Sequence, residues 1–181
     1  MVIPLPGHAV TSPMIFGKLP SHGDFIARGL NGSERDELDR WLSSSMADAR
    51  ERFGAGFADA FDAALPSLFA WDEGSWTAGA MAPSIDSAGR RFPLIVALRG
   101  LDRSMARAAS ERCEEVIFAA VAECWITDRL ADELSSVAIA PGSSDVDEGW
   151  WRKDGGDLEL RQRLPPGILT RMIGTPIGAA R

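Results

Sequence analysis

The sequence predicts an α/β (α+β) sandwich, a single domain in which a mostly antiparallel central sheet is flanked by helices. Two long segments, 33–53 and 104–125, carry apolar residues at helical spacing. Short apolar runs bounded by turn residues lie between them, and a further strand pair follows near the C-terminus. Hairpin strands need helices packed on their apolar face, and 181 residues are enough for one such core.

The N-terminal segment 1–12 contains two prolines and a glycine, and we expect a flexible leader there. The domain proper is expected over 13–173, followed by a flexible tail over 174–181. Its first strand is predicted at 14–16, where three apolar residues precede Gly17.

The first long helix is expected to begin at Ser33, because Asp36 follows three residues later as in a capping box. Gly54 supplies the end of this helix. A second, shorter amphipathic helix is predicted over 57–64, and Pro66 breaks it.

A β-hairpin is predicted next, with strands at 68–71 and 76–81 around a turn at 72–74. The polar segment 83–91 is expected to be a loop. The dense apolar run 92–98 predicts a central strand that is buried on both faces.

The second long helix, 104–125, holds both cysteines of the chain, Cys113 and Cys124. Eleven helical residues separate them by roughly 16 Å, which is too far for a disulfide. Both are expected on the apolar face, so we predict two buried free thiols.

The pattern weakens toward the C-terminus. A short strand is predicted at 137–140, and a terminal hairpin is predicted from 149–151 and 158–160 around a turn at 154–156. Pro165-Pro166-Gly167 is expected to open a last short helix that ends near Ile173.

Composition excludes several function classes. The net charge is −7 and no run of basic residues exists, so we expect no nucleic-acid partner. The chain shows neither a signal peptide nor an apolar run near 20 residues, so we expect a cytoplasmic protein without membrane insertion. Cys/His clusters, GxGxxG and Walker-type motifs are missing, and the acidic loop 141–148 lacks EF-hand spacing. We therefore expect no metal and no cofactor.

The sequence offers one candidate catalytic group. His22 lies beside Asp24 and directly follows Ser21, which suggests a general-base pair with a nucleophile. Side chains of adjacent residues diverge, however, so a hydrogen-bonded loop is the favoured interpretation. We expect no catalytic residues and no enzyme activity.

Two loops combine restrictive proline, permissive glycine and opposite charges beside an aromatic residue, and each borders a predicted strand. They supply all the candidate motif and partner-binding residues. The first loop contributes Gly17, Lys18, Pro20, Ser21, His22, Gly23, Asp24 and Phe25, and the second contributes Pro83, Ser84, Asp86, Gly89, Arg90, Arg91, Phe92 and Pro93.

Two interpretations of these loops stay open. They can be structural clasps, with Asp24 or Asp86 capping backbone amides and Arg90 or Arg91 pairing across. They can also form a recognition surface, because loops on a rigid scaffold often carry binding. The charged side chains of such a surface would be those of Lys18, His22, Asp24, Asp86, Arg90 and Arg91.

The same loops resemble a known family. GKLPSHGDF is similar to the GKLPSRGDF signature of TagF (ImpM) proteins, and MAPSIDSAGRRFPL resembles their PS-x-D-x-x-GR-x-FPL signature. The helix sequence LDRWL and the late Trp150-Trp151 pair also resemble family features, so the likeness extends from Met14 to Trp151. The chain departs from the family pattern at His22, where arginine is common, and at 68–71, which replaces a Trp-Arg-Phe stretch.

The resemblance implies a cytoplasmic accessory protein of a bacterial type VI secretion system. Such proteins act as post-translational repressors, oppose a Thr-kinase-dependent activation route, and are expected to bind a forkhead-associated scaffold protein. Some relatives are fused to a PppA-like phosphatase domain, for which we expect this chain to be too short. The alternatives are a structural component of the secretion machine, or a small hydrolase that uses Ser21 or Ser84 with His22.

Overall fold

The computed structural model describes residues 11–136, 138–142, 146–153 and 157–174. The expected tail, apart from Gly174, and most of the expected leader lie outside these ranges, as does the expected turn at 154–156. At the N-terminal end, Ser12 already belongs to the first strand, which therefore begins two residues earlier than the predicted strand at 14–16.

In the part of the chain that the structure describes, seven strands form one antiparallel sheet in the order β2-β1-β5-β4-β3-β6-β7. The strands are β1 (Ser12–Gly17), β2 (Ile26–Arg28), β3 (Ser67–Asp72), β4 (Trp76–Ala82), β5 (Leu94–Leu101), β6 (Gly149–Trp151) and β7 (Asp157–Leu160). The predicted fold class is confirmed, and so are both predicted hairpins, β3–β4 and β6–β7.

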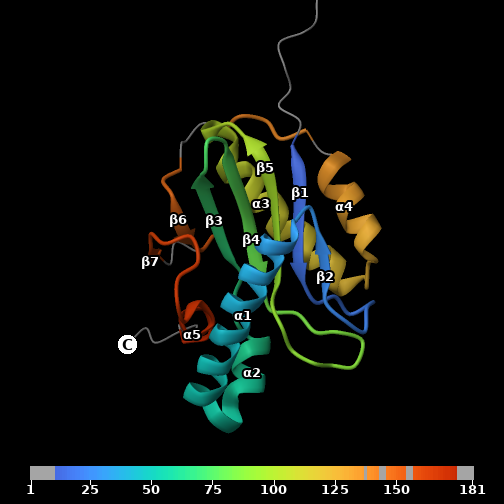
Figure 1. The fold of residues 1–181 in the computed structure, drawn as a ribbon, viewed down its shortest axis with the longest axis vertical. Coiled ribbons are helices and arrows are strands. Elements are labelled where there is room, and N and C mark those ends of the chain that lie inside the picture. Colours follow the sequence, from blue (N-terminus) through green and yellow to red (C-terminus); the bar gives the residue numbers. More distant parts are fainter. Residues whose placement is uncertain (1–10, 137, 143–145, 154–156, 175–181) are drawn as a thin grey trace, which may run out of the picture.

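Helices cover both faces of this sheet, α1 in front of it and α3 behind it in Figure 1. The helices are α1 (Gly32–Phe53), α2 (Phe57–Asp62), α3 (Ala106–Ala122), α4 (Thr127–Ser136) and α5 (Ile168–Ile173), with short 3₁₀ turns at Gly54–Gly56 and Arg103–Met105. One core lies between the sheet and α1, α2 and α5, and the other lies between the sheet and α3 and α4. Within the described residues, no helix has both the length and the apolar character needed to cross a membrane.

The alternation of side chains along β1 assigns residues to the two cores. Met14 and Phe16 pack toward α1, whereas Ile15 packs toward α3. Every residue of β5 from Leu94 to Leu98 is buried, as predicted for a central strand, although the strand begins two residues later than expected. Burying each large apolar side chain contributes about 1.5–3 kcal/mol, so the two cores stabilise the sheet from both sides.

The predicted start of α1 is wrong. Asn31, not Ser33, is the N-cap, and its side chain accepts the backbone N–H of Glu34. The Glu34 carboxylate in turn accepts the N–H of Asn31 at 2.8 Å, which completes a capping box. This reciprocal pair places the helix start two residues earlier than the Ser33–Asp36 spacing suggested.

The second long helix is shorter than predicted. α3 ends at Ala122, and Cys124 beyond it has a left-handed backbone with φ 51°. The reversal lets the Trp125 ring bury against the same core as α3. Cys113 is buried as expected, and burial raises the pKa of its thiol to about 12. Cys124 is exposed, so the expectation of two buried thiols is wrong for this one.

Two elements were not predicted, the three-residue strand β2 and the helix α4. The strand expected at 137–140 is absent from its described part, 138–140, which is irregular. The helix α5 begins at Ile168, directly after the expected Pro165-Pro166-Gly167 opening.

Candidate functional site

The two motif loops lie at the same end of the sheet (Figure 1). One joins β1 to β2 and the other joins β4 to β5, and β1 pairs with β5 so that Gly17 faces Leu94. Gly17 has φ 134°, and a Cβ on it would lie 2.1 Å from the Pro93 carbonyl oxygen. The backbones therefore meet at a position that only glycine fits.

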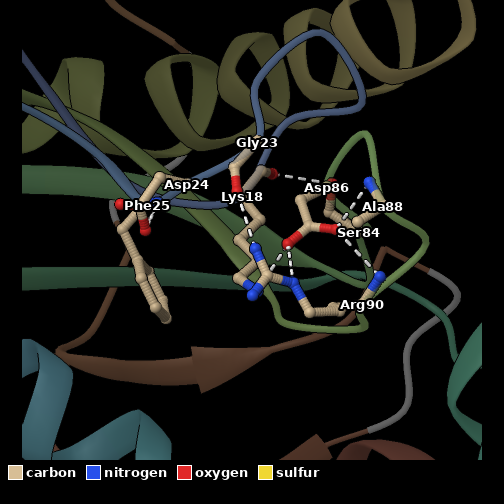
Figure 2. Close-up of polar contacts among 8 residues, drawn as sticks. All are labelled: Lys18, Gly23, Asp24, Phe25, Ser84, Asp86, Ala88 and Arg90. Carbon is tan, nitrogen blue, oxygen red and sulfur yellow. Dashed lines mark hydrogen bonds and ion pairs between the residues drawn. The ribbon is translucent and has the colours of Figure 1, made fainter.

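The carboxylate of Asp86 is the centre of contact between the loops (Figure 2). One oxygen accepts the backbone N–H groups of Ala88 and Arg90, at 3.0 and 2.9 Å. The other accepts Lys18 Nζ at 2.8 Å and Arg90 Nε at 2.7 Å. The hydrogen bond from Lys18, helped by those from Arg90 and Ala88, holds the pKa of Asp86 well below its ordinary range even though burial alone would raise it.

Three further hydrogen bonds join the two loops, and each is accepted by a backbone carbonyl of the first loop. Ser84 Oγ donates to the Lys18 carbonyl at 2.8 Å, and the N–H of Ser87 donates to the His22 carbonyl at 2.8 Å. Arg90 Nη2 donates to the Gly23 carbonyl at 2.6 Å. We refer to the interlocked residues Lys18, Gly23, Ser84, Asp86 and Arg90 as the clasp.

Turns shape each loop before the clasp joins them. Pro20 occupies the second position of a turn that the His22 N–H closes on the Leu19 carbonyl at 3.0 Å. In the second loop, Gly89 adopts φ 75° and donates its N–H to the Asp86 carbonyl. Phe92 N–H donates to the Ser84 carbonyl, so that Phe92 and Pro93 enter the core beside β5. Pro83, at the start of the loop, is half-buried.

The expectation that Ser21 and His22 diverge is wrong. Ser21 Oγ lies 2.8 Å from His22 Nδ1, and it also donates to the Trp125 carbonyl at 2.6 Å. Because the hydroxyl hydrogen goes to that carbonyl, Nδ1 must donate to the serine oxygen, and Nε2 then accepts from Thr127 Oγ1 at 3.2 Å. A histidine in this tautomer orders the loop against α4 and does not remove the Ser21 proton.

Asp24 and Phe25, together with Gly23, are the exposed members of the first loop. Asp24 accepts the N–H of Phe25 at 2.8 Å, so its carboxylate caps the local backbone instead of orienting His22. The Phe25 ring is 43% exposed and packs edge-on to Phe92 with centroids 4.7 Å apart. Lys18 Nζ lies 4.9 Å from the Phe25 ring centroid, which ties this ring to the clasp.

A groove of 520 Å³ lies between the clasp and the helices α1 and α2. The motif loops line it with Lys18, Phe25, Gly89, Arg90, Arg91 and Phe92. The helices line it with Ser43, Met46, Arg50 and Phe57. Four of the lining side chains are cationic and none is acidic, in a chain with more acidic than basic residues.

Two of the groove cations have different surroundings. Arg91 makes a bidentate pair with Asp62 of α2, through Nε and Nη2 at 2.7 Å each, and the pair lowers the pKa of Asp62. Arg50 stands over the Phe57 ring at 5.5 Å from its centroid. Sequence reasoning missed Arg50 and Phe57, because a basic residue in the last turn of a helix is also explained by the helix dipole.

The candidate residues therefore differ in their exposure to solvent. Lys18, Ser84 and Asp86 are buried, whereas Asp24, Phe25 and Arg90 are exposed and His22 and Arg91 are half-buried. The contacts are those expected of a clasp, and the exposed members also line a groove. Across the described residues, no group of three or more His, Cys, Asp or Glu side chains could hold a metal ion.

Comparison with known proteins finds a family model and similar solved structures. A family model described as the TagF N-terminal domain, type VI secretion system-associated, matches residues 14–140, which include both motif loops and α1. The crystal structure of PA0076 from Pseudomonas aeruginosa PAO1 superposes with a TM-score of 0.60 at 27% sequence identity. That match covers 72% of this chain and 64% of the PA0076 chain, so it spans less than two thirds of the relative. A search of curated proteins returned no match.

Proposed function

Because the chain belongs to the TagF N-terminal domain family, associated with type VI secretion, we propose that it is a cytoplasmic, non-enzymatic repressor of such a system. In this proposal it acts after translation, by binding the forkhead-associated scaffold protein of the same system. Binding alone can withhold a scaffold from assembly, so the proposal requires no catalytic step.

The observation that carries the proposal is the rigid, partly exposed surface at the joined motif loops. Buried hydrogen bonds around Asp86 fix the backbone, and Phe25 and Arg90 are presented from it to solvent. A preformed surface loses little conformational entropy on binding, which favours recognition of a protein partner. Exposed aromatic and arginine side chains are also the types enriched at the centres of protein interfaces.

Titration calorimetry of this chain with the forkhead-associated protein of its own secretion system tests the partner. We expect a stoichiometric complex, and no detectable heat or co-purification would contradict this partner. Overproduction of the chain in its host should lower secretion by the system, and deletion should raise it. Secretion unchanged in both strains would contradict the repressor role, and co-sedimentation with assembled sheath would instead favour a structural component.

The contact between Ser21 and His22 is the one observation that favours a second function, a small hydrolase. Two features oppose it: the Ser21 hydroxyl is already committed to the Trp125 carbonyl, and Asp24 does not orient the imidazole. We expect no turnover of ester substrates by the purified protein. Turnover that disappears in His22→Ala would establish the hydrolase instead.

A further inference from the structure

We propose that the groove between the clasp, α1 and α2 binds an acidic peptide segment of a partner protein. The anionic side chains of that segment would lie at Arg50, Arg90 and Arg91, and an apolar side chain would lie against Phe25. This inference rests on the proposed function only in taking the chain to be an interaction module. It goes beyond the proposed function by naming the chemistry of the bound segment. It also assigns a binding role to Arg50, a residue of α1 that lies outside both motif loops.

Charge is the first observation. The chain carries 26 acidic and 19 basic residues, yet the groove is lined by four cations and by no carboxylate. Of the acidic side chains near the groove, Asp86 accepts four hydrogen bonds and Asp62 pairs with Arg91 through both oxygens. Asp59 interacts with Arg91 without lining the groove. A local excess of positive charge on an acidic protein favours anions at this one place.

Unused donors are the second observation. Arg90 uses Nε and Nη2 on the clasp, and Arg91 uses Nε and Nη2 on Asp62, so each keeps Nη1. Arg50 is exposed, and among the described residues no carboxylate pairs with it, so its whole guanidinium fork is available. Such a fork matches the two oxygens of a carboxylate or a phosphate.

Shape is the third observation, and it favours a peptide over other anionic partners. The anion donors share a concave groove with the rings of Phe25 and Phe57, so charged and apolar side chains of one strand of peptide can be bound together. A lipid surface would instead need an outward-facing basic patch. Nucleic acid is disfavoured by the overall charge of −7.

Fluorescence anisotropy with labelled peptides tests this inference. The probe is a twelve-residue peptide that alternates glutamate with leucine and glycine, and the control is its glutamine counterpart. A third peptide replaces one glutamate with phosphothreonine and separates carboxylate from phosphate as the source of the anion. Vesicles with a third of anionic lipid provide the membrane arm.

Arg50→Glu is the variant of choice, because Arg50 is exposed and outside the clasp. Arg52→Glu is its matched control, since Arg52 lies in the same last helical turn, is exposed and does not line the groove. We expect Arg50→Glu to weaken binding of the acidic peptide on the order of tenfold, and Arg52→Glu to change it less than about twofold. Equal Tm values for both variants would show that the fold is kept.

The outcomes separate this inference from the proposed function. Equal binding of the glutamate and glutamine peptides, equal losses in the two variants, or binding of vesicles but not of peptides would each overturn the groove proposal. Capture of the forkhead-associated protein by wild type and Arg50→Glu alike would also overturn it, while leaving the proposed function intact. Peptide binding that depends on Arg50, without capture of that protein, would contradict only the proposed partner.

Discussion

The clasp and the groove share Lys18 and Arg90 but use charge in opposite ways. In the clasp, the Asp86 carboxylate is buried and every oxygen contact is made within the chain. In the groove, Arg50 and one edge of Arg91 still face solvent. Buried charges must be paired and therefore determine stability, whereas exposed charges contribute little to stability and stay available for a ligand. In our proposal, residues that stabilise the fold and residues that bind a partner thus lie side by side in these loops.

The largest effect should come from removing the centre of the clasp. Asp86→Ala leaves the buried Lys18 ammonium without its carboxylate, and a buried charge without a partner is strongly destabilising. We expect Tm to fall on the order of 10 °C or more. Differential scanning fluorimetry measures this, with Asp24→Ala as the matched control because Asp24 is exposed. A similar Tm for both variants would contradict the conclusion that buried Asp86 stabilises the fold more than exposed Asp24 does.

Gly17→Ala should have the next largest effect. The new Cβ would overlap the Pro93 carbonyl oxygen at a backbone angle that alanine avoids, which costs about 3 kcal/mol. Urea unfolding measures the change in free energy. The control is Gly56→Ala, where a Cβ meets nothing within 4 Å and φ is −81°. Unfolding midpoints that agree between the two would contradict the close approach of the loops.

Acid should weaken the clasp in a defined direction. The pKa of Asp86 is lowered from its ordinary value of 3.8, so its contribution to stability is fully present above that value and is lost progressively as pH falls below it, toward the lowered pKa of the folded state. Asp62 and Glu34 also have lowered pKa values and add to the loss. Tm should therefore fall progressively below about pH 4, and less steeply in Asp86→Asn. Equal dependence of Tm on pH in wild type and Asp86→Asn would contradict a contribution of Asp86 to the acid sensitivity.

Arg91→Ala should have the smallest effect on stability. Its pair with Asp62 is partly exposed, and such pairs contribute less than about 1 kcal/mol. Binding of the acidic peptide should nevertheless weaken several-fold, because one cation of the groove is lost. Urea unfolding measures the change in stability, and fluorescence anisotropy on the same preparation measures the change in peptide binding. A large loss of stability with unchanged binding would reverse the assignment of Arg91 from groove to scaffold.

Local patterns predicted the parts of the fold that depend on local chemistry. The β3–β4 hairpin follows from two apolar runs around Asp72-Glu73-Gly74, and the α5 start follows from Gly167 after two prolines. β2 was missed because three residues carry no period, and its formation depends on pairing with β1. Cys124 was misplaced because the buried Trp125 ring ends α3 early, which is a tertiary effect.

The candidate site was predictable only on its loop side. Proline, glycine and opposite charges in two strand-bordering segments indicated that the loops matter, and Asp86 and Arg90 make the kinds of contact expected of a clasp. Arg50 and Phe57 could not be found in this way, since their relation to the loops exists only after α1 packs on the sheet. The short contact of Ser21 with His22 was likewise decided by α4, an element that was not predicted.

The contact between Lys18 and Asp86 joins residues 68 positions apart in the chain. Contacts of such long range form late in folding, because the intervening hairpin and helices must first be ordered. A growing chain that has not yet placed β5 beside β1 cannot close the clasp, so it cannot display the finished groove. The surface should therefore form only once β5 is in place, and a chain that ends before β5 would not compete with the intact protein for a partner.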